Sequence, residues 1–450
     1  MVPVFVLDPY FFAPARAARL ARRMQFLLDS LAELAGELER LGSRLLVVEG
    51  KSYEVIPELA RQVRADRVVA QRWCEPFARA RDERVRTRLT VPLELFEGET
   101  LCPPGTLRTG AGTPYTVFTP FARAFARDSA VAEPLARPSS LPALPSDIEL
   151  RRLVVPTTDD LGWRRNSAVI AGGERAGQER LATFLNGGGV RYHQERDRLD
   201  LAATSRLSAD LKFGTLSPRR VWHAAARALS AAPLALRSFT NELVWREFTH
   251  STLVDFPAVL TGPFRAAWRD FPYRDDPDGW RAWVNGTTGY PVVDAASRQL
   301  LGEGFVHNRA RMIAASFLTK HLLIDYRRGE QHYLELLVDG DWAQNNAGWQ
   351  WSAGSGLDAQ PYFRVFNPRA QGEKFDPEGA YVKRWVPELQ NLPARYVHCP
   401  SDAPERVLRE AGVTLGVTYP RPVVDHQEAR ARFLAIAESA TRRGGVTPSP

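Results

Sequence analysis

The stretch Asp339-Gly-Asp-Trp-Ala-Gln-Asn-Asn-Ala-Gly-Trp-Gln-Trp351 decides how the rest of the chain is interpreted. It places two carboxylates, two adjacent Asn amides and three tryptophans within thirteen residues. If its second half is helical, Asn345 and Trp349 share a face, whereas Trp349 and Trp351 point roughly opposite ways. One ring could then face an internal cofactor and the other an external partner. Spacing alone favours a Trp-rich core helix, but other segments of the chain overturn that interpretation.

Length and composition predict a globular chain with two domains. At 450 residues the chain exceeds one ordinary core, and 44% hydrophobic and 25% charged residues are typical of soluble proteins. No apolar run approaches the length that spans a bilayer. The start, Met1-Val-Pro-Val-Phe-Val-Leu-Asp-Pro, predicts a strand rather than a signal peptide, so we expect a cytoplasmic protein.

Charge and cysteine content limit the possible sites. Cys74, Cys102 and Cys399 are far apart and form no CxxC pair, so we expect no zinc site, no iron–sulfur cluster and no disulfide framework. A net charge of +7 and a pI of about 9.4 permit nucleic-acid binding. Most of the positive charge is arginine, which suits bidentate phosphate contacts.

Residues 1 to about 125 alternate short apolar strands with amphipathic helices. This alternation predicts a parallel α/β sheet, and no GxGxxG dinucleotide fingerprint occurs there. The expected strands are 4–7, 45–48 and 67–70, and the expected helices are 20–41, 52–63 and 76–89.

The second half of the chain looks mostly helical, with apolar stripes at 310–326 and 330–338. A Pro- and Ser-rich segment, 128–165, precedes it. We therefore expect an α/β domain over 1–125, a linker over 126–175, a helical domain over 176–440 and a frayed tail over 441–450.

Polar clusters interrupt this helical half. Thr204-Ser-Arg-Leu-Ser208 offers three hydroxyls at a helix start, which suits a phosphate, although an ordinary N-cap explains it too. Glu242 and Trp245 stand three apart, so an acid and a ring could recognise and stack on a base; a salt-bridged amphipathic helix is the alternative. Asn308 and Met312 stand four apart, and Arg311 could pair with a carboxylate such as Asp339.

Five segments occur in the order and spacing of the DNA photolyase/cryptochrome family. They are Asn241-Glu-Leu-Val-Trp-Arg-Glu-Phe248, Thr288-Gly-Tyr-Pro-Val-Val-Asp-Ala-Ala296, His307-Asn-Arg-Ala-Arg-Met-Ile313, the 339–351 stretch and Pro361-Tyr-Phe-Arg-Val-Phe-Asn-Pro368. The chain resembles this family from about Val4 to His426, most strongly over 190–390, and within it the class I cyclobutane pyrimidine dimer photolyases.

The resemblance implies an α/β antenna domain with a parallel Rossmann-like sheet, followed by an all-α domain that holds FAD. Photolyases flip a damaged pyrimidine pair out of the duplex. Excited FADH⁻ passes an electron to the lesion, the cyclobutane bonds break, and the electron returns. The cofactor carries the redox chemistry, and the protein positions it.

The resemblance also implies which residues hold FAD. Arg311 would pair with Asp339 beside the isoalloxazine, and Asn345 would face flavin N5. A neutral amide adds no second negative charge beside the reduced anionic flavin. Plant cryptochromes carry Asp at that position, so Asn345 favours repair. The remaining flavin-binding positions are Tyr192, Thr204, Ser205, Arg206, Leu207, Ser208, Phe239, Gly340 and Asp341.

Other positions match the family's lesion pocket and DNA contacts. Glu242 would hydrogen-bond the thymine edge, and Trp245 and Trp351 would form aromatic walls. Photolyases that act on the 6-4 photoproduct carry His near the position of Met312; Met cannot move a proton, so a cyclobutane dimer is the expected substrate. The expected DNA contacts, besides Glu242 and Trp245, are Arg246, Asn308, Arg309, Arg364 and Arg196.

The chain departs from the family pattern at its start and at its antenna segment. It opens at what resembles the family's second strand, so we expect a sheet without its first strand, exposed strand edges and weak solubility. The segment Gly110-Ala-Gly-Thr-Pro-Tyr-Thr-Val-Phe118 lacks the Glu that folate-binding relatives place at the position of Thr113. It resembles the deazaflavin-binding type more closely, and the absence of any antenna is the alternative.

The third departure concerns electron transfer. The family usually reduces FAD through three tryptophans, but behind Trp349 this chain has Tyr326 and Tyr273 at the middle and distal positions. Tyrosine oxidation normally requires the loss of a proton as well as an electron. We therefore expect slow photoreduction or a different route through Trp268, Trp280, Trp283 or Trp342.

The predicted function is light-driven splitting of pyrimidine dimers in UV-damaged DNA by a monomeric carbon–carbon lyase without a membrane partner. One alternative is a cryptochrome-like FAD blue-light receptor without repair activity, against which Asn345, the lesion-pocket residues and the short tail weigh. A folded remnant without activity is the third hypothesis.

Overall fold

The computed structural model describes residues 1–146 and 148–443, which form two compact units. Unit 1 consists of Met1–Val190, Ser205–Pro257 and Val338–Ala343, and unit 2 of Arg191–Thr204, Ala258–Leu337 and Gln344–Pro450. Residues 444–450 of the expected frayed tail lie outside the described residues. The bounds expected for the α/β domain, linker and helical domain stay a prediction.

Four short strands of unit 1 form two separate parallel sheets. Strand β1 (Val4–Leu7) pairs with β2 (Leu46–Glu49), with Val4 opposite Leu46. Strand β3 (Val68–Gln71) pairs with β4 (Leu93–Phe96). The predicted parallel α/β architecture is confirmed, and each expected strand begins within one residue of its observed start. Among the described residues no strand joins β1 to β3.

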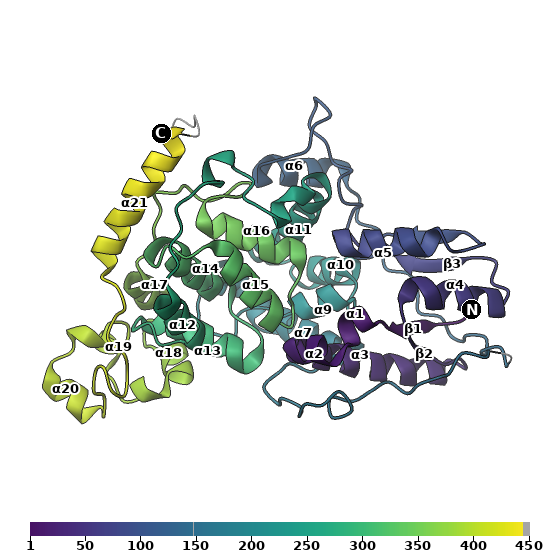
Figure 1. Ribbon diagram of the computed structural model, residues 1–450, viewed down its shortest axis with the longest axis horizontal. Helices are drawn as coiled ribbons and strands as arrows, with labels where there is room; N and C mark the ends of the chain where they lie inside the picture. Colours follow the sequence, from purple (N-terminus) through teal and green to yellow (C-terminus); the bar gives the residue numbers. More distant parts are fainter. Residues whose placement is uncertain (147, 444–450) are drawn as a thin grey trace. The chain divides into compact units, whose positions relative to one another are not determined.

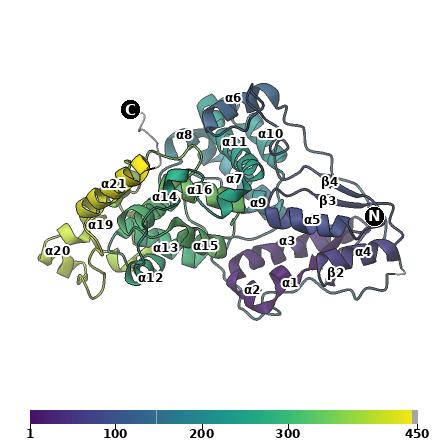
Figure 2. The same ribbon diagram turned by 45° about the horizontal axis from the view of Figure 1, so that its top comes forward.

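Successive residues of the β1–β2 sheet point to opposite faces, and both faces carry apolar side chains. Helices therefore cover both faces. Leu7 and Val47 pack with Leu31 and Leu38 of α3 (Ala21–Arg40). Leu46 and Val48 pack with Leu59 of α4 (Ser52–Gln62) on the other side. Figures 1 and 2 show these purple and blue elements close together.

The rest of unit 1 is helical or irregular. In the predicted linker, the described residues 129–146 and 148–165 contain no helix. The linker contacts the β1–β2 sheet through an isolated antiparallel bridge between Val47 and Leu153. The other helices of this unit are α1 (Pro9–Phe12), α2 (Pro14–Arg19), α5 (Pro76–Arg86), α6 (Phe118–Asp128), α7 (Glu174–Asn186), α9 (Ser208–Phe213), α10 (Pro218–Ala228) and α11 (Pro233–Asp255).

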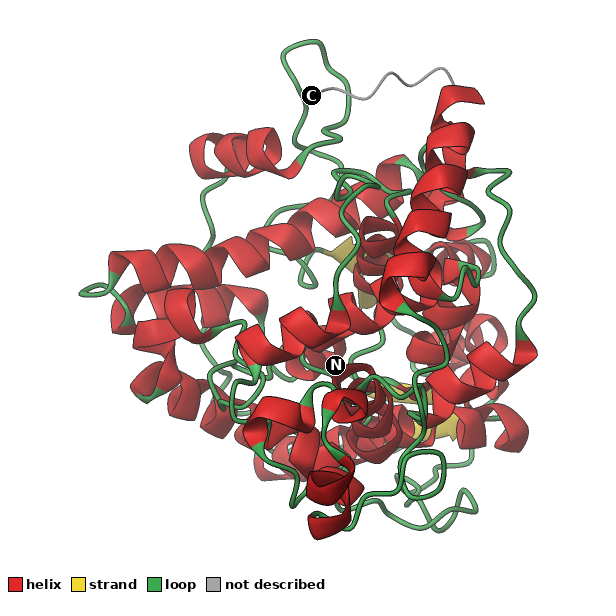
Figure 3. Ribbon diagram, turned by 90° about the vertical axis from the view of Figure 1, so that its left-hand side faces the viewer, coloured by secondary structure: helices red, strands yellow, loops and turns green. Residues whose placement is uncertain are grey.

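Unit 2 is built from helices around an apolar core that contains Trp283, Tyr326, Tyr333 and Trp349. Figure 3, coloured by secondary structure, shows how far helices outnumber strands in the chain. The helices are α8 (Tyr192–Glu195), α12 (Pro277–Asn285), α13 (Pro291–Glu303), α14 (Asn308–Ser316), α15 (Tyr326–Leu336), α16 (Trp342–Ala353, beginning in unit 1), α17 (Pro368–Phe375), α18 (Ala380–Trp385), α19 (Ala394–Val397), α20 (Glu405–Glu410) and α21 (His426–Arg443). Short 3-10 turns occur at η1 (Gly188–Arg191), η2 (Pro257–Leu260), η3 (Ala266–Trp268), η5 (Pro387–Leu389) and η6 (Pro400–Asp402).

The apolar stripe at 310–326 is not one helix. Helix α14 ends at Ser316. A π-helical turn, η4 (Phe317–His321), follows it directly. Leu323 then adopts a left-handed φ of 56°, and an α-helix cannot continue through a residue in that conformation. Asp325 caps the next helix by accepting the N–H of Arg327 at 2.9 Å, so α15 starts at Tyr326. None of the described helices is both long enough and apolar enough to cross a bilayer.

Candidate functional site

The second half of the opening stretch is helical, as predicted, and lies on α16. Asn345 is half-buried, and its side-chain N–H donates to the carbonyl oxygen of Glu330 at 2.9 Å. The amide of Asn346 donates to the Glu330 carboxyl at 3.0 Å. Trp349 is buried whereas Trp351 is half-exposed, so the two rings have different surroundings. The helix therefore presents a fixed neutral amide and one partly accessible tryptophan.

The hydroxyl-rich loop has an unusual backbone. Arg206 adopts a left-handed φ of 52°, which costs a non-glycine residue energy and occurs mostly where function requires it. Ser205 is half-buried, Leu207 is buried and Ser208 is exposed at the start of α9; Thr204, also half-buried, closes the preceding segment of unit 2. Hydroxyl and backbone donors in this arrangement are the donor set that suits a phosphate.

The remaining flavin-binding candidates are mostly buried. Phe239 of α11 is buried with its ring 4.8 Å from Phe184, and Asp339, Gly340 and Asp341 are buried in unit 1. In unit 2, Tyr192 is buried beneath the guanidinium of Arg196, 5.5 Å from its ring, and Arg311 donates to the Val306 carbonyl at 2.7 Å. Asp339 and Arg311 belong to different units, so their pairing stays a prediction.

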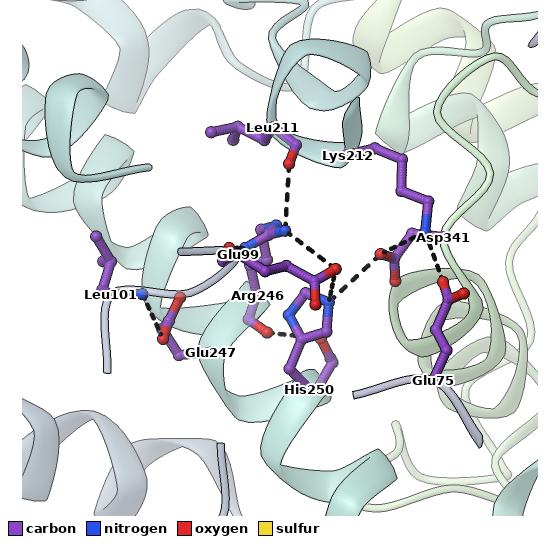
Figure 4. Close-up of polar contacts among 10 residues, drawn as sticks. Glu75, Glu99, Leu101, Leu211, Lys212, Arg246, Glu247, His250 and Asp341 are labelled. Carbon is purple, nitrogen blue, oxygen red and sulfur yellow. Dashed lines mark hydrogen bonds and ion pairs between the residues drawn. The ribbon is translucent and has the colours of Figure 1, made fainter. Parts of the chain in front are cut away.

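Asp341 is part of a buried ion network that the sequence did not indicate (Figure 4). Lys212 lies 3.7 Å from the Asp341 carboxylate and 2.5 Å from that of Glu75. His250 lies 3.3 Å from Asp341. Burial alone would raise the pKa of Asp341, but the charges of His250 and Lys212 outweigh it and hold the pKa well below its usual value. Asp341 is therefore a fixed anion.

Arg246, expected to contact DNA, lies inside this network, and that expectation is wrong. Its side chain is buried and donates to the carbonyl oxygens of Glu99 and, at 3.4 Å, Leu211. Its neighbour Glu247 accepts the N–H of Leu101 at 2.9 Å. A guanidinium held by two carbonyls away from solvent cannot reach a phosphate, so Arg246 stabilises unit 1 instead.

The same network brings three potential metal ligands together. The side chains of Cys74, Glu99 and His250 are buried and place ligand atoms within 4.8 Å of one another. The guanidinium of Arg246 lies 3.9 Å from the Glu99 carboxylate, and the ammonium of Lys212 lies 3.7 Å from the neighbouring Asp341 carboxylate (Figure 4). A metal ion would be repelled by them, so we interpret the cluster as an ion network rather than a metal centre.

The predicted lesion-contacting residues lie on α11 in unit 1 and on α14 and α16 in unit 2. Glu242 and Trp245 are half-buried, and the ring of Phe118 stacks on Trp245 at 3.7 Å with an interplanar angle of 6°. On α14 the amide of Asn308 lies 3.9 Å from the sulfur of half-buried Met312. The assembly of these residues into one pocket stays a prediction.

Unit 2 contains a basic cleft of about 500 Å³. It brings together Arg309 and Arg364, which were predicted to contact DNA, whereas Arg196 is not among its lining residues. Arg309 pairs with Asp197 at 2.7 Å, and the cleft retains an excess of positive charge. The sequence analysis missed Arg198, Gln371 and Lys374, although Lys374 is one of only five lysines in the chain. The lining residues are Gln194, Asp197, Arg198, Arg309, Arg364, Phe366, Gln371, Lys374 and Phe375.

Comparison with known proteins identifies the family of the chain. A family model described as DNA photolyase matches residues 1–140, and one described as the FAD binding domain of DNA photolyase matches residues 239–439. A deoxyribodipyrimidine photo-lyase of Agrobacterium fabrum is 43% identical over 420 residues, which cover 91% of this chain and 87% of the relative. The chain belongs to the DNA photolyase family.

Solved structures of photolyases and cryptochromes share its fold. A class III photolyase from Agrobacterium tumefaciens matches with a TM-score of 0.90 and 39% identity, covering 98% of this chain and 92% of that protein. A Synechocystis cryptochrome matches with a TM-score of 0.87 and 29% identity, covering 97% and 93%. This photolyase is a carbon–carbon lyase of light-driven DNA repair, with FAD as its cofactor and UV-damaged DNA as its substrate.

The predicted electron-transfer residues of the photolyase, Trp349, Tyr326 and Tyr273, all lie in unit 2. Within the described residues the ring contacts of Trp349 are with Trp283 and Tyr333, not with Tyr326 or Tyr273. Tyr273 instead contacts Phe271, 4.7 Å away. Of the expected substitutes, Trp268 packs with Phe271 and Phe433 in a separate cluster, and Trp342 belongs to unit 1. Trp283 contacts both Trp280, at 5.5 Å, and Trp349, at 6.0 Å. The route of electron transfer stays a prediction.

Proposed function

We propose that this photolyase, acting as a monomer, repairs cyclobutane pyrimidine dimers. The observation that carries the proposal is the half-exposed face of α14, where Asn308 and Met312 stand together. A thioether and an amide cannot donate and recover a proton near neutral pH. Splitting two carbon–carbon bonds requires electron transfer rather than acid–base catalysis by the pocket. The face of α14 therefore suits a cyclobutane dimer better than a 6-4 photoproduct.

Glu242, Trp245 and Trp351 would bind the flipped lesion. The Glu242 carboxylate would accept a hydrogen bond from a pyrimidine N–H, and the two indoles would stack on the bases. Asn308, Arg309 and Arg364 would hold the flanking phosphates, and the cleft of unit 2 supports this role because its cations outnumber its single carboxylate.

FAD would be held by residues whose chemistry fits it. The loop from Thr204 to Ser208 offers hydroxyls and backbone donors for the diphosphate, and buried Phe239 offers a ring. Asn345 is anchored by Glu330, and its neutral amide would face the reactive edge of the flavin without adding charge. Tyr192, Arg311, Asp339, Gly340 and Asp341 would complete the set. When reduced and excited by light, the cofactor supplies the electron that splits the dimer.

The test uses the FAD-loaded, chemically reduced protein and an oligonucleotide that carries one thymine dimer. Illumination is expected to restore thymine absorbance, whereas an oligonucleotide with a 6-4 photoproduct should stay unchanged. Glu242→Gln should slow repair, and Glu410→Gln on exposed α20 is the matched control. Loss of repair by the unaltered protein despite bound reduced FAD would overturn the proposal and favour a light receptor.

Two finer expectations accompany this proposal. The class I assignment stays a prediction, because the Agrobacterium tumefaciens structure is that of a class III photolyase. A deazaflavin-type antenna also stays a prediction. Thr113, where folate-binding relatives carry Glu, is exposed and hydrogen-bonded to Thr109 at 2.8 Å.

A further inference from the structure

Lys320 is a fully buried cation of unit 2. It lies in the π-helical turn η4, a rare kind of element that occurs often at functional sites, and none of its surface is exposed. Among the described residues no carboxylate pairs with its ammonium. A buried charge without a counter-ion costs free energy that a neutral side chain would avoid. A lysine at this position therefore calls for a role other than packing.

The ammonium of Lys320 is directed at the chain segment that carries Arg364. It donates to the backbone carbonyl of Arg364 at 2.9 Å. Residues 361–367 form no helix or strand, and the N–H groups of Arg364 and Val365 donate only to carbonyls within this segment. The hydrogen bond from Lys320 therefore ties an irregular segment to the core of the unit.

The side chain of Arg364 has the opposite surroundings. It is exposed and lines the basic cleft together with Arg309 and Lys374. Arg309 pairs with Asp197, whereas Arg364 pairs with no carboxylate among the described residues. The guanidinium of Arg364 can therefore bind a phosphate, and its backbone is already fixed. A group that is ordered before binding loses less freedom when its partner arrives.

The charges of Lys320 and Arg364 are coupled. Burial, and to a lesser extent the positive charge of Arg364, lowers the pKa of Lys320 to about 7. A phosphate that pairs with Arg364 offsets this positive charge, so bound DNA favours the protonated form of the lysine. Part of the free protein holds a neutral Lys320 above neutral pH, and DNA shifts that part toward the ammonium.

The other ionisable groups around η4 do not titrate in the same range. They are His321 within the turn, and His426 and Arg432 on α21, both of which contact His321. Burial lowers the pKa of His321 to about 3 and that of His426 below its usual value, so both rings are neutral above pH of about 7. Arg432 keeps its charge. Helices α14 and α15 also pack against η4, but they bring no charged group close enough to shift the pKa of Lys320.

We propose that Lys320 is a positioning residue for DNA binding, which holds the backbone of Arg364 and takes up a proton when Arg364 binds a phosphate of the DNA. The proton comes from solvent and remains on the amine while the DNA is bound. Binding and protonation favour each other by the same factor. Affinity for DNA therefore falls as the pH rises above about 7. The inference rests on the proposed contact between Arg364 and DNA.

The first experiment measures this proton on the unaltered, FAD-loaded protein. An oligonucleotide with one thymine dimer is titrated in the dark by calorimetry, in two buffers that differ in their heat of ionisation. The buffer dependence of the heat is expected to show net proton uptake at pH 8 and much less at pH 6. Equal heats in both buffers at pH 8 would overturn the proposal.

Variants give the second experiment. Lys320→Met should weaken binding of the same oligonucleotide roughly tenfold at pH 6.5, less at pH 9, and should abolish proton uptake. It should also raise Tm, because a buried charge without a counter-ion is removed. A lysine that only stabilised the fold would instead give a lower Tm with unchanged proton uptake. The matched control is Lys383→Met on α18, which removes a half-buried lysine of unit 2 outside the cleft and should keep the pH dependence.

Two further variants test the path through Arg364. In an Arg364→Ala background, Lys320→Met should change affinity little further; fully additive losses would reject a role through this arginine. Lys320→Gln keeps a donor for the carbonyl but cannot titrate, so it should recover part of the affinity without proton uptake. If Lys320→Met fails to fold, Lys320→Gln and the calorimetry of the unaltered protein still decide the question.

Two outcomes separate this inference from the proposed function. Proton uptake on binding, combined with no repair of the thymine dimer under light, would reject the substrate but keep the role of Lys320. Normal repair, combined with no proton uptake and unchanged affinity of Lys320→Met, would do the reverse.

Discussion

Glu330 shows how one buried carboxyl can tie α15 to α16. Its backbone oxygen accepts the amide N–H of Asn345, and its side chain accepts that of Asn346 at 3.0 Å. The sequence indicated Asn345 through the family pattern but gave no reason to single out Glu330, because nothing local reveals that its carboxyl is withdrawn from water. The same limit explains Arg246, whose buried acceptors come from segments distant in the chain.

Replacing Glu330 should change how stability depends on pH. Burial raises the pKa of Glu330 from 4.5 to about 7, so the folded state holds this proton more tightly than the unfolded state. The protonated Glu330 carboxyl therefore contributes fully to stability below a pH of about 4.5, and this contribution is lost as the pH rises through about 7. Glu330→Gln cannot ionise and should be more stable than the unaltered protein above pH of about 8, by at most about 3 kcal/mol.

Thermal unfolding of both proteins across this pH range provides the measurement. The difference in Tm should shrink toward acid pH and grow toward alkaline pH. A difference that is the same at both ends would show that Glu330 does not titrate in this window.

At the scale of elements, the positions of strands and helices were largely predictable from sequence periodicity. Strand β1 matches its expected span, and α3 and α4 lie within one residue of theirs. The exception is the stripe at 310–326, where the left-handed Leu323 and the Asp325 cap outweigh the apolar pattern. Periodicity reports which face is buried, but it does not report where a backbone turn interrupts the helix.

The packing of α15 against α16 depends on a glycine. A Cβ on Gly329 would lie 2.3 Å from the ring of Trp349, so α15 approaches this ring more closely than any other residue would allow. Gly329→Ala should therefore destabilise the protein by about 1–3 kcal/mol, through displacement of the ring. Urea unfolding measures the change, and Trp349 fluorescence should shift with it.

Gly348 is the matched control, because it lies on α16 beside Trp349 but a Cβ there meets nothing within 4 Å. Gly348→Ala should stabilise the helix by about 0.5–1 kcal/mol. Equal effects of the two substitutions would show that helix propensity, rather than contact with Trp349, governs this region.

At the scale of the molecule, the two short sheets of unit 1 leave apolar side chains in contact with water. Val69 on β3 is 56% exposed and Phe96 on β4 is 57% exposed. Each sheet has only two strands, so backbone groups along its edges lack a strand partner among the described residues. Exposed apolar side chains beside open edges favour association between molecules. The parallel pairing was predictable from the alternation of strands and helices, whereas the separation into two sheets and the exposure of Phe96 required the structure.

Phe96→Ser should raise solubility with little change in the free energy of unfolding, within about 0.5 kcal/mol. The measurements are light scattering during heating and the protein concentration of a saturated solution. Leu95→Ser is the comparison, because the neighbouring strand position points to the opposite, more buried face and should lose stability instead. An unchanged solubility of Phe96→Ser would show that this face does not drive association.

The stack of Phe118 on Trp245 has a consequence for recognition. The indole is held flat against a neighbouring ring before any DNA arrives, so its rotational freedom is lost during folding rather than during binding. Fixing a mobile side chain at an interface costs roughly 0.5–1.5 kcal/mol. A flipped base would meet a rigid surface and add a third layer to an existing stack. Selectivity for damage would then depend on how readily a base leaves the duplex, because the protein wall itself need not rearrange.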